Sequence, residues 1–178
     1  MYRIRKSIDI DFAHHVAGHA GPCANLHGHT WKFEVGLSAE ELDKEGFVVD
    51  FKHLKEQVLK PCHNLLDHCV AMGSTTYDKV ADDLAKVGVE LIETRRAIHG
   101  TIDTCPQEEI TLEGAVNRFP GGMKVAVFSF NPTSERMAKW LYELSKSRLE
   151  DGRVKVVFAR IYETLHPVES VAEYREDG

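Results

Sequence analysis

Apolar and polar residues alternate in two segments near the start of the chain, and this alternation predicts two neighbouring β-strands. Ile8–Phe12 alternates strictly, and Trp31, Phe33, Val35 and Leu37 are each followed by a polar residue or glycine. A period of two is typical of a half-buried strand, because successive side chains point to opposite faces of a sheet. Each strand therefore has one face available for a core.

Helical spacing follows in the next segment. Phe51, Leu54 and Val58 recur three to four residues apart, which places them on one face of a helix. Proline removes a backbone donor, so we expect Pro61 to end this helix. Residues 62–69 would then form a loop or a short second turn.

A longer helix is predicted at about residues 75–97. Thr75 or Thr76 can cap its N-terminus, and Gly88 is unfavourable within it. Its expected apolar face comprises Tyr77, Val80, Leu84, Val87 and Leu91.

The last third of the chain reads as strand, helix and strand after an irregular segment. Residues 98–122 are interrupted by glycine and proline and predict no regular element. Met123–Phe130 has strand character, Asn131-Pro132-Thr133 opens a helix, and Val154–Glu163 is rich in β-branched and aromatic residues, as expected of a last strand. This order indicates an α+β fold. The buried stripe of the helix is predicted to comprise Met137, Trp140, Leu141 and Leu144.

Size and charge limit the possible functions. The chain has 178 residues, of which 43% are hydrophobic, as expected of one globular domain spanning residues 1–178. Its formal net charge is −6. Nucleic-acid binding needs a basic surface that displaces phosphate counterions, so we expect no nucleic-acid partner.

No membrane partner is expected either. No apolar run approaches the roughly 20 residues that span a bilayer, and Met1–Lys6 has no apolar signal region behind it. We therefore expect a cytoplasmic protein. Its cysteines, Cys23, Cys62, Cys69 and Cys105, are irregularly spaced, which favours free thiols over a disulfide framework.

The segment Cys23–His29 indicates metal chemistry. His27 and His29 are two residues apart, so on an extended strand both imidazoles can face one ion. His14 ends the preceding predicted strand and can lie beside them. Three histidines and an open position describe a catalytic zinc site, whereas structural zinc usually has four protein ligands. The alternative for the His-x-His pair alone is a chance surface occurrence.

Five motifs follow one another along the chain. They are Asp11–His15, Cys23-x-x-x-His27-Gly28-His29, Val49-Asp50-Phe51 with Leu54-Lys55, Leu66-Asp67-His68, and Asn131–Glu135 followed distantly by Glu163-Thr164 and Ala172-Glu173-Tyr174. The ordered set resembles the 6-pyruvoyltetrahydropterin synthase superfamily. It is most similar to the bacterial 6-carboxy-5,6,7,8-tetrahydropterin synthases of queuosine and 7-deazaguanine biosynthesis.

The resemblance implies that His14, His27 and His29 hold a Zn²⁺ ion. His14 is implied as the first ligand because the family's Ala-His pair falls on Ala13-His14. The alternative is that His15 binds the metal while His14 packs in the core.

The resemblance also implies proton-transfer residues. Cys23 resembles the family's catalytic base, and a nearby cation would stabilise its thiolate. The alternative is a small buried hydrophobe. Asp67 and His68 resemble a second proton-transfer pair, in which the carboxylate orients the imidazole. Without the family, this dipeptide is typical of a solvated loop, and Cys62-His63 is an equal competitor.

Substrate contacts are implied at the end of the last strand and at the last helix. Glu163 resembles the residue that anchors the pterin, since a carboxylate can accept two parallel N–H bonds from the amino-pyrimidinone edge. Thr133, Ser134 and Glu135 fall where the family supplies further pterin contacts. Glu135 also suits an ordinary first helical turn, where negative charge is favoured.

The reaction implied is that of a zinc-dependent lyase acting on 7,8-dihydroneopterin triphosphate. Its products would be 6-carboxy-5,6,7,8-tetrahydropterin, acetaldehyde and triphosphate. One alternative is the pyruvoyl branch, which eliminates triphosphate and retains the side chain; another is a noncatalytic zinc or pterin-binding scaffold. The three residues between Cys23 and His27 favour the carboxy branch. Arg160 and several lysines are candidates for the triphosphate, with a solvated surface as the alternative.

The implied architecture is the tunnelling fold. An antiparallel four-stranded sheet with helices on one face forms barrels by oligomerisation, commonly as a trimer or hexamer with active sites between subunits. This chain departs from compact members by a predicted insertion at about residues 72–122. The insertion could cover the active site and alter the substrate, but long surface insertions are well tolerated, which favours decoration or oligomer packing.

Overall fold

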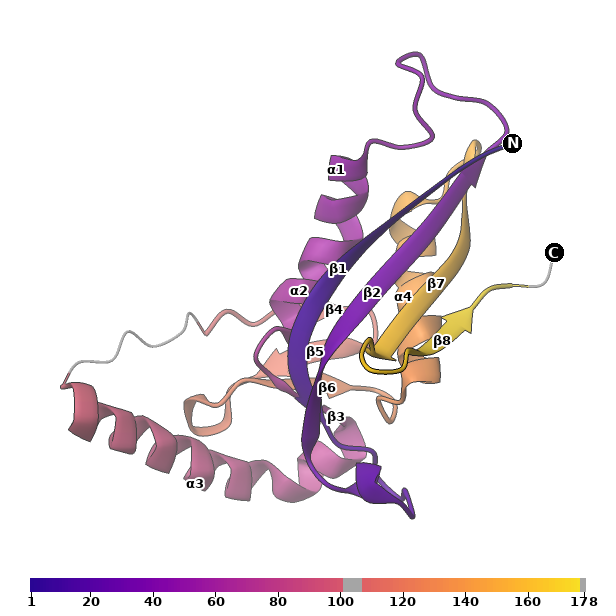
Figure 1. Ribbon diagram of the computed structural model, residues 1–178. Coiled ribbons are helices and arrows are strands. Elements are labelled where there is room, and N and C mark those ends of the chain that lie inside the picture. Colours follow the sequence, from indigo (N-terminus) through magenta and orange to yellow (C-terminus); the bar gives the residue numbers. More distant parts are fainter. Residues whose placement is uncertain (101–106, 177–178) are drawn as a thin grey trace. The chain divides into compact units, whose positions relative to one another are not determined.

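The computed structural model describes residues 1–100 and 107–176 and contains a mixed eight-stranded sheet with helices (Figure 1). The strand order is β4-β5-β6-β3-β1-β2-β7-β8. By their contacts the residues form two compact units. The first comprises Met1–Phe12, Gly28–Asp67 and the described residues from Thr133 onward; the second comprises Ala13–His27 and the described part of 68–132.

The first unit is built on long strands. β1 (Tyr2–His14) and β2 (His27–Ala39) lie mostly within it. β7 (Val154–Thr164) pairs antiparallel with β2, and β8 (Ser170–Tyr174) pairs antiparallel with β7. The predicted strand is confirmed as β2, and its apolar members are fully buried: Trp31, Phe33, Val35 and Leu37. The half-buried pattern is wrong beyond Lys32, because every residue from Phe33 to Ala39 is buried on both faces of the strand.

Two helical segments belong to this unit. The first runs without a break through α1 (Phe51–Leu54), the π-helical η2 (Lys55–Leu59) and α2 (Lys60–Leu66). The second is α4 (Ser134–Leu149), which packs on β7 and β8. The predicted stripe of α4 is confirmed, since all of its members are buried: Met137, Trp140, Leu141 and Leu144.

The prediction that Pro61 ends the first helix is wrong. Pro61 lies within the first two residues of α2, directly after the π-helical turn. A proline cannot donate to the carbonyl four residues earlier, which here belongs to Gln57. That carbonyl instead accepts a hydrogen bond from Nη1 of Arg148 at 3.0 Å. The helix therefore continues, because another side chain supplies the missing donor.

The second unit contains β6, which the sequence predicted, and the shorter strands β3, β4 and β5, which it did not. β3 (Val70–Gly73) pairs parallel with both the end of β1 and β6 (Val125–Phe128). β5 (Ala115–Arg118) pairs antiparallel with β6 and with β4 (Thr111–Leu112). The expected four-stranded antiparallel sheet is therefore wrong: the sheet has eight strands and is mixed.

Two further corrections concern short strands. β4 and β5 lie within the segment predicted to be irregular, and their two and four residues are too few to show a period. The strand at Val154–Glu163 is confirmed as β7, but it is not the last, because β8 follows Pro167. Two short 3-10 helices complete the elements, η1 (Pro22–Ala24) and η3 (Pro120–Gly122).

The predicted long helix is confirmed as α3 (Ser74–His99). Its N-terminal half packs on the core of the second unit, which contains Met72, Val125 and Val127. Gly88 is buried where α3 contacts η3, and a Cβ there would lie 2.6 Å from the carbonyl oxygen of Pro120. The glycine that disfavoured the helix is thus required by this close approach.

None of the described helices combines the length and apolar character needed to cross a bilayer. Among the described residues Cys23, Cys62 and Cys69 form no disulfide. Cys105 lies outside the described residues. The single-domain organisation and the insertion at about 72–122 stay predictions.

Candidate metal centre

His14 and His27 meet in the second unit. His14 is the last residue of β1 and is buried, and His27 is the first residue of β2. Their Nε2 atoms are 3.0 Å apart, and the two rings pack edge to face. Strand pairing with β3 holds the end of β1, where Ala13 is opposite Val70. The backbone N–H of the neighbouring His15 donates to Ala71.

Backbone carbonyls determine the tautomers of this pair. Nδ1 of His14 lies 3.0 Å from the carbonyl oxygen of Pro132, and Nδ1 of His27 lies 2.8 Å from that of Asn25. A carbonyl can only accept, so each Nδ1 carries the proton and each Nε2 presents a lone pair. Two lone pairs cannot hydrogen-bond each other. The pair is therefore arranged to share a cation, as metal-binding histidines usually are.

His29 and Glu163 form the corresponding pair in the first unit. Lys32 of β2 is opposite Tyr162 of β7, so Glu163 projects on the sheet face that His29 and Trp31 share. Nε2 of His29 lies 3.6 Å from Oε1 of Glu163. The His29 ring is supported by an edge-to-face contact with Trp31, whose centroid is 5.3 Å away.

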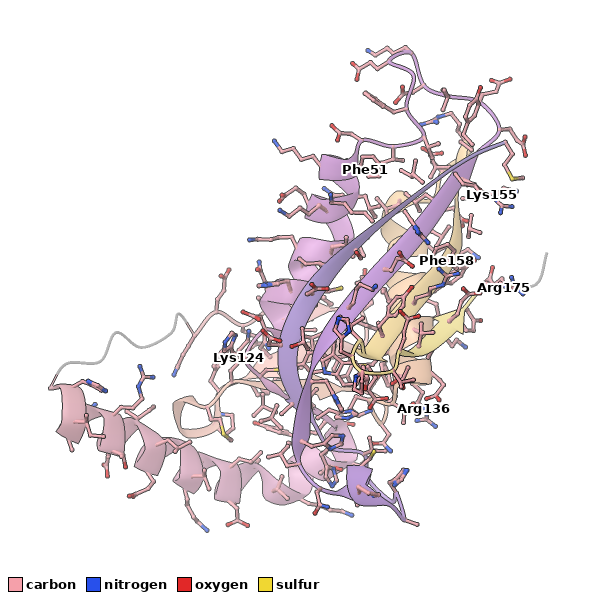
Figure 2. The ribbon with its side chains drawn as sticks, viewed as in Figure 1. Phe51, Lys124, Arg136, Lys155, Phe158 and Arg175 are labelled. Atoms are coloured by element: carbon pink, nitrogen blue, oxygen red, sulfur yellow. The ribbon has the colours of Figure 1, made fainter. Side chains whose placement is uncertain are left out.

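Ser134 orients the carboxylate of Glu163. Its hydroxyl donates to Oε2 of Glu163 at 2.8 Å. Ser134 is the first residue of α4, and the backbone donors at a helix N-terminus favour a nearby negative charge. Arg136, labelled in Figure 2, marks this first turn.

His27 and His29 are two residues apart at the start of β2, a spacing that puts both side chains on the same face of an extended strand. The residues that could ligate a metal ion form a group of two such pairs, His14 with His27 in the second unit and His29 with Glu163 in the first. Imidazole nitrogen and carboxylate oxygen are ligands that zinc prefers, so these residues fit the zinc site that the sequence indicated. His14 belongs to this group and His15 does not.

The other predicted catalytic residues lie on short connections. Cys23 is half-buried in η1, and its carbonyl accepts a hydrogen bond from the N–H of Val16. Asp67 caps the C-terminus of α2. Its Oδ1 lies 3.9 Å from Nε2 of His63, which belongs to Cys62-His63, the alternative to the Asp67-His68 pair. His68 follows with φ +57°, an uncommon conformation for a residue with a Cβ.

The residues expected to contact the pterin surround the N-terminus of α4. Thr133 caps the helix by accepting from the N–H of Arg136 at 3.4 Å, and Glu135 is exposed in the first turn. Ser134 and Glu163 are brought together by their hydrogen bond. Glu135 has the position of an ordinary first-turn acid, which was the alternative for it.

Sequence reasoning missed several residues that position the histidines. The side-chain amide of Asn131 both accepts from and donates to the backbone of Ala17, at 3.0 Å in each case. This pair of bonds fixes the chain beside Pro132, whose carbonyl orients His14. The motif Asn131–Glu135 contained this signal, but only its last three residues were assigned roles.

Arg160, a candidate for the triphosphate, is engaged by carboxylates on the sheet. Its Nη1 lies 3.1 Å from Oε2 of Glu34, its Nε lies 2.6 Å from Oε2 of Glu173, and its guanidinium stacks over Phe158, labelled in Figure 2. Burial opposes the charge, but the hydrogen bonds to Glu173 and Glu34 raise the pKa of Arg160. Burial, followed by the hydrogen bond to Glu34, raises the pKa of Tyr162.

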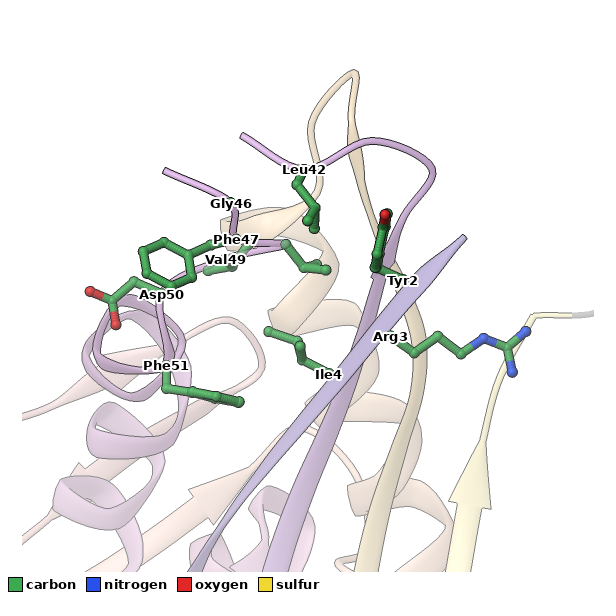
Figure 3. A pocket seen from close by; sticks show the side chains of 10 residues that line it. Tyr2, Arg3, Ile4, Leu42, Gly46, Phe47, Val49, Asp50 and Phe51 are labelled. Atoms are coloured by element: carbon green, nitrogen blue, oxygen red, sulfur yellow. The ribbon is translucent and has the colours of Figure 1, made fainter. Parts of the chain in front are cut away.

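A pocket of about 280 Å³ lies elsewhere in the first unit (Figure 3). It is formed by the N-terminal end of β1 and the segment that precedes α1, including Tyr2, Ile4, Phe47 and Phe51. None of the residues predicted for the metal or the pterin lines it. The candidate site is therefore defined by its side chains and not by this pocket.

The chain is similar to known proteins over most of its length. The family model described as 6-pyruvoyl tetrahydropterin synthase matches residues 3–177. A 6-carboxy-5,6,7,8-tetrahydropterin synthase from Aquifex aeolicus is 29% identical over 161 residues, which cover 87% of this chain and 76% of the relative. A protein of the same name from Haemophilus influenzae is 38% identical over 78 residues, 42% of this chain and 55% of the relative.

Solved structures share the fold. An uncharacterized protein from Wolinella succinogenes is 26% identical with a TM-score of 0.69, covering 99% of this chain and 98% of its own. The 6-pyruvoyl tetrahydropterin synthase from Caenorhabditis elegans is 17% identical with a TM-score of 0.55, over 99% and 96% of the two chains, and shows similarity of fold alone. Because the family model matches nearly the whole chain, this protein belongs to the 6-pyruvoyl tetrahydropterin synthase family.

Proposed function

We propose that this protein is a zinc-dependent lyase that converts 7,8-dihydroneopterin triphosphate to 6-carboxy-5,6,7,8-tetrahydropterin, acetaldehyde and triphosphate, in the formation of queuosine precursors. The observation that carries the proposal is the arrangement of His14 and His27. Their Nε2 lone pairs face each other at 3.0 Å, at motif positions that the resemblance assigns to the metal. The names of the relatives from Aquifex aeolicus and Haemophilus influenzae favour the carboxy branch.

The metal would be held by His14, His27 and His29. A bound Zn²⁺ would polarise the oxygens of the hydroxylated substrate side chain. Backbone carbonyls already hold Nδ1 of His14 and His27, so their Nε2 atoms are oriented before any ligand binds.

Proton transfer is assigned to Cys23 and to Asp67 with His68. Cys23 would remove a proton from a substrate carbon as the thiolate, and His68 would carry a second proton. The half-buried thiol of Cys23 and the exposed imidazole of His68 remain accessible to a substrate. His63, which lies 3.9 Å from Asp67, is the competing partner for that carboxylate.

Recognition of the pterin is assigned to the N-terminus of α4 and the end of β7. The carboxylate of Glu163 can accept two parallel N–H bonds from the amino-pyrimidinone edge. Ser134 holds this carboxylate, and Thr133 and Glu135 begin the same helix.

We further propose that the protein acts in the cytoplasm as a homo-oligomer, a trimer or hexamer, with active sites at subunit interfaces. The segment at about 72–122 would be decoration or packing between subunits.

Product identification tests the reaction. The zinc-loaded protein is incubated with 7,8-dihydroneopterin triphosphate, and the products are identified by mass spectrometry. Acetaldehyde together with 6-carboxytetrahydropterin is expected. A product that retains the side chain would instead assign the pyruvoyl branch. No turnover by folded, zinc-loaded protein would contradict both and favour a binding scaffold.

A further inference from the structure

A second pocket, of about 180 Å³, lies on the face of the first unit's sheet that α4 does not cover. All of its lining residues belong to this unit. Arg160 lines it, whereas the neighbours of Arg160 on β7, Ala159 and Ile161, are fully buried in the strand on which α4 packs. Successive side chains of a strand point to opposite faces, so the pocket faces away from α4.

Gly36 and Phe158 shape this pocket. They are opposite each other in the pairing of β2 with β7, and a Cβ at residue 36 would overlap the ring of Phe158. The guanidinium of Arg160 stacks over the same ring, 4.1 Å from its centroid. Figure 2 labels Phe158 on β7 and Arg175 beyond the end of β8. The glycine therefore makes room for an aromatic ring that supports an arginine inside the pocket.

The pocket is basic although the whole chain is acidic. Three arginines and one glutamate line it: Arg3, Arg160, Arg175 and Glu173. The chain as a whole has a formal net charge of −6. Arg160 is fixed, because its Nε donates to Glu173 at 2.6 Å and its Nη1 donates to Glu34 at 3.1 Å. The carboxylates near the pocket are thus bound to the central arginine.

The other two arginines keep donors for a ligand. Nε of Arg175 lies 3.9 Å from Oε1 of Glu173, which is too far for a hydrogen bond, and the Arg175 side chain is 68% exposed. Nη2 of Arg3 contacts Sδ of Met1 at 3.5 Å, and a thioether is a weak acceptor. Both guanidinium groups can therefore turn toward an anion without breaking a strong contact.

We propose that this pocket binds a free oligophosphate, such as inorganic triphosphate. A planar guanidinium can donate two parallel hydrogen bonds to phosphate oxygens. Arg3 comes from β1 and Arg175 follows β8, and these strands are three strand spacings apart, about 14 Å. Several linked phosphates can contact both arginines together with Arg160, and a single phosphate cannot span them as well.

This site is separate from the pterin contact assigned to Glu163. The hydroxyl of Ser134, at the start of α4, donates to Glu163, so that carboxylate lies on the face of the sheet that α4 covers. The pocket with Arg160 lies on the opposite face. The inference goes beyond the proposed function and does not depend on it.

Binding of inorganic triphosphate to the full chain tests the proposal by isothermal titration calorimetry. We expect Arg3→Gln combined with Arg175→Gln to weaken binding at least about 10-fold, because charge-assisted hydrogen bonds to phosphate are lost. Higher salt should weaken binding to wild type, since the arginines are exposed. Inorganic phosphate should bind at least about 10-fold more weakly than triphosphate. Thermal unfolding of the double variant should match wild type.

Two further variants serve as controls. Arg96→Gln removes an exposed arginine on α3, in the other unit, and should leave the affinity for triphosphate unchanged. His27→Ala removes a candidate metal ligand, and it should also bind triphosphate as wild type does.

The outcomes separate this inference from the proposed function. Equal affinity of wild type and the double variant, or no binding to wild type, would overturn the site. Loss of binding in His27→Ala would assign the triphosphate to the metal centre and would likewise overturn it. Equal affinities for phosphate and triphosphate would refute the choice of an oligophosphate. Binding as expected, by a protein that does not turn over 7,8-dihydroneopterin triphosphate, would support this site and contradict the proposed lyase.

Discussion

Nε2 of His14 and Nε2 of His27 face each other at 3.0 Å, while the Nδ1 atom of each ring donates to a backbone carbonyl. In two neutral rings neither Nε2 atom can donate to the other, so a hydrogen bond between them needs an additional proton on one ring, and a metal ion can take the place of that proton. The fold supports this arrangement through the pairing of β1 with β3. A shared cation, either a proton or a metal ion, would therefore stabilise this histidine pair.

Metal removal should therefore destabilise the protein. Zinc at 100 times its dissociation constant would raise the free energy of unfolding by about 2.7 kcal/mol, because it binds the folded state. We expect a chelator to lower Tm and added zinc to restore it. In His27→Ala the response of Tm to zinc should largely disappear, as measured by calorimetry. An unchanged zinc response in this variant would contradict the assignment of His27.

His68 allows stability and activity to be separated. Its φ of +57° is unfavourable for a residue with a Cβ, and glycine adopts such a conformation readily. We expect His68→Gly to leave stability unchanged or to raise it by up to about 1 kcal/mol, while turnover falls by about 100-fold or more through loss of the imidazole. Urea unfolding and a turnover assay check the two effects. Full turnover in this variant would transfer the role to another residue, with His63 the first candidate.

The Tyr162 hydroxyl should make stability depend on pH at the alkaline end. It donates to the buried carboxylate of Glu34 at 3.0 Å, and burial together with this bond raises the pKa of Tyr162 above its ordinary value. Because the pKa of Tyr162 is higher in the folded protein, its hydroxyl contributes its full stabilisation below pH about 10, the ordinary pKa of tyrosine. This contribution to stability is lost as the pH rises through the pKa of Tyr162 in the folded protein.

Tyr162→Phe should lower the free energy of unfolding by about 1.5–3 kcal/mol at neutral pH, because it removes a hydrogen bond to a charged group. The variant should also lose less stability than wild type above about pH 10. Unfolding by urea between pH 7 and 11 measures both. Tyr2→Phe, at an exposed tyrosine, is the control and should change neither. Parallel pH profiles for Tyr162→Phe and wild type would refute this account.

Gly88→Ala tests the contact between α3 and η3. Helix propensity alone favours alanine by about 1 kcal/mol. The added Cβ would lie 2.6 Å from the Pro120 carbonyl oxygen, so backbone atoms must move, which typically costs about 1–3 kcal/mol. We expect net destabilisation in thermal unfolding. Gly152→Ala is the control, because no atom lies within 4 Å of its new Cβ, and its effect on stability should be close to zero. Stabilisation by Gly88→Ala would show that the contact between α3 and η3 does not exclude a Cβ at this position.

The longer elements were predictable because each buries a periodic stripe. Trp31, Phe33, Val35 and Leu37 in β2 and the apolar residues of α4 repeat often enough to define a period. β4 and β5 were not predictable, since their stability comes from pairing with distant strands. The prediction that Pro61 ends the helix failed for a similar reason, because Arg148, which donates to the carbonyl of Gln57, is far away in sequence.

The proposed metal ligands could be predicted from the sequence as residue types, but their spatial arrangement could not. His27 and His29 are read directly from a two-residue spacing. The groups that orient the site are the carbonyls of Asn25 and Pro132, and backbone atoms leave no signature in side-chain identity. The proximity of Glu163 to His29 depends on the register between β2 and β7, which a single sequence does not reveal.

The proposed lyase activity is tested most directly by comparing the turnover of 7,8-dihydroneopterin triphosphate by wild type and by Cys23→Ala, both loaded with equal amounts of zinc. Loss of a proton-transfer group typically lowers a rate by about 100-fold to 10,000-fold. We expect triphosphate release by wild type and a loss of this size in a variant that keeps its fold and metal content. Equal turnover by the two proteins, or none by either, would contradict the proposal.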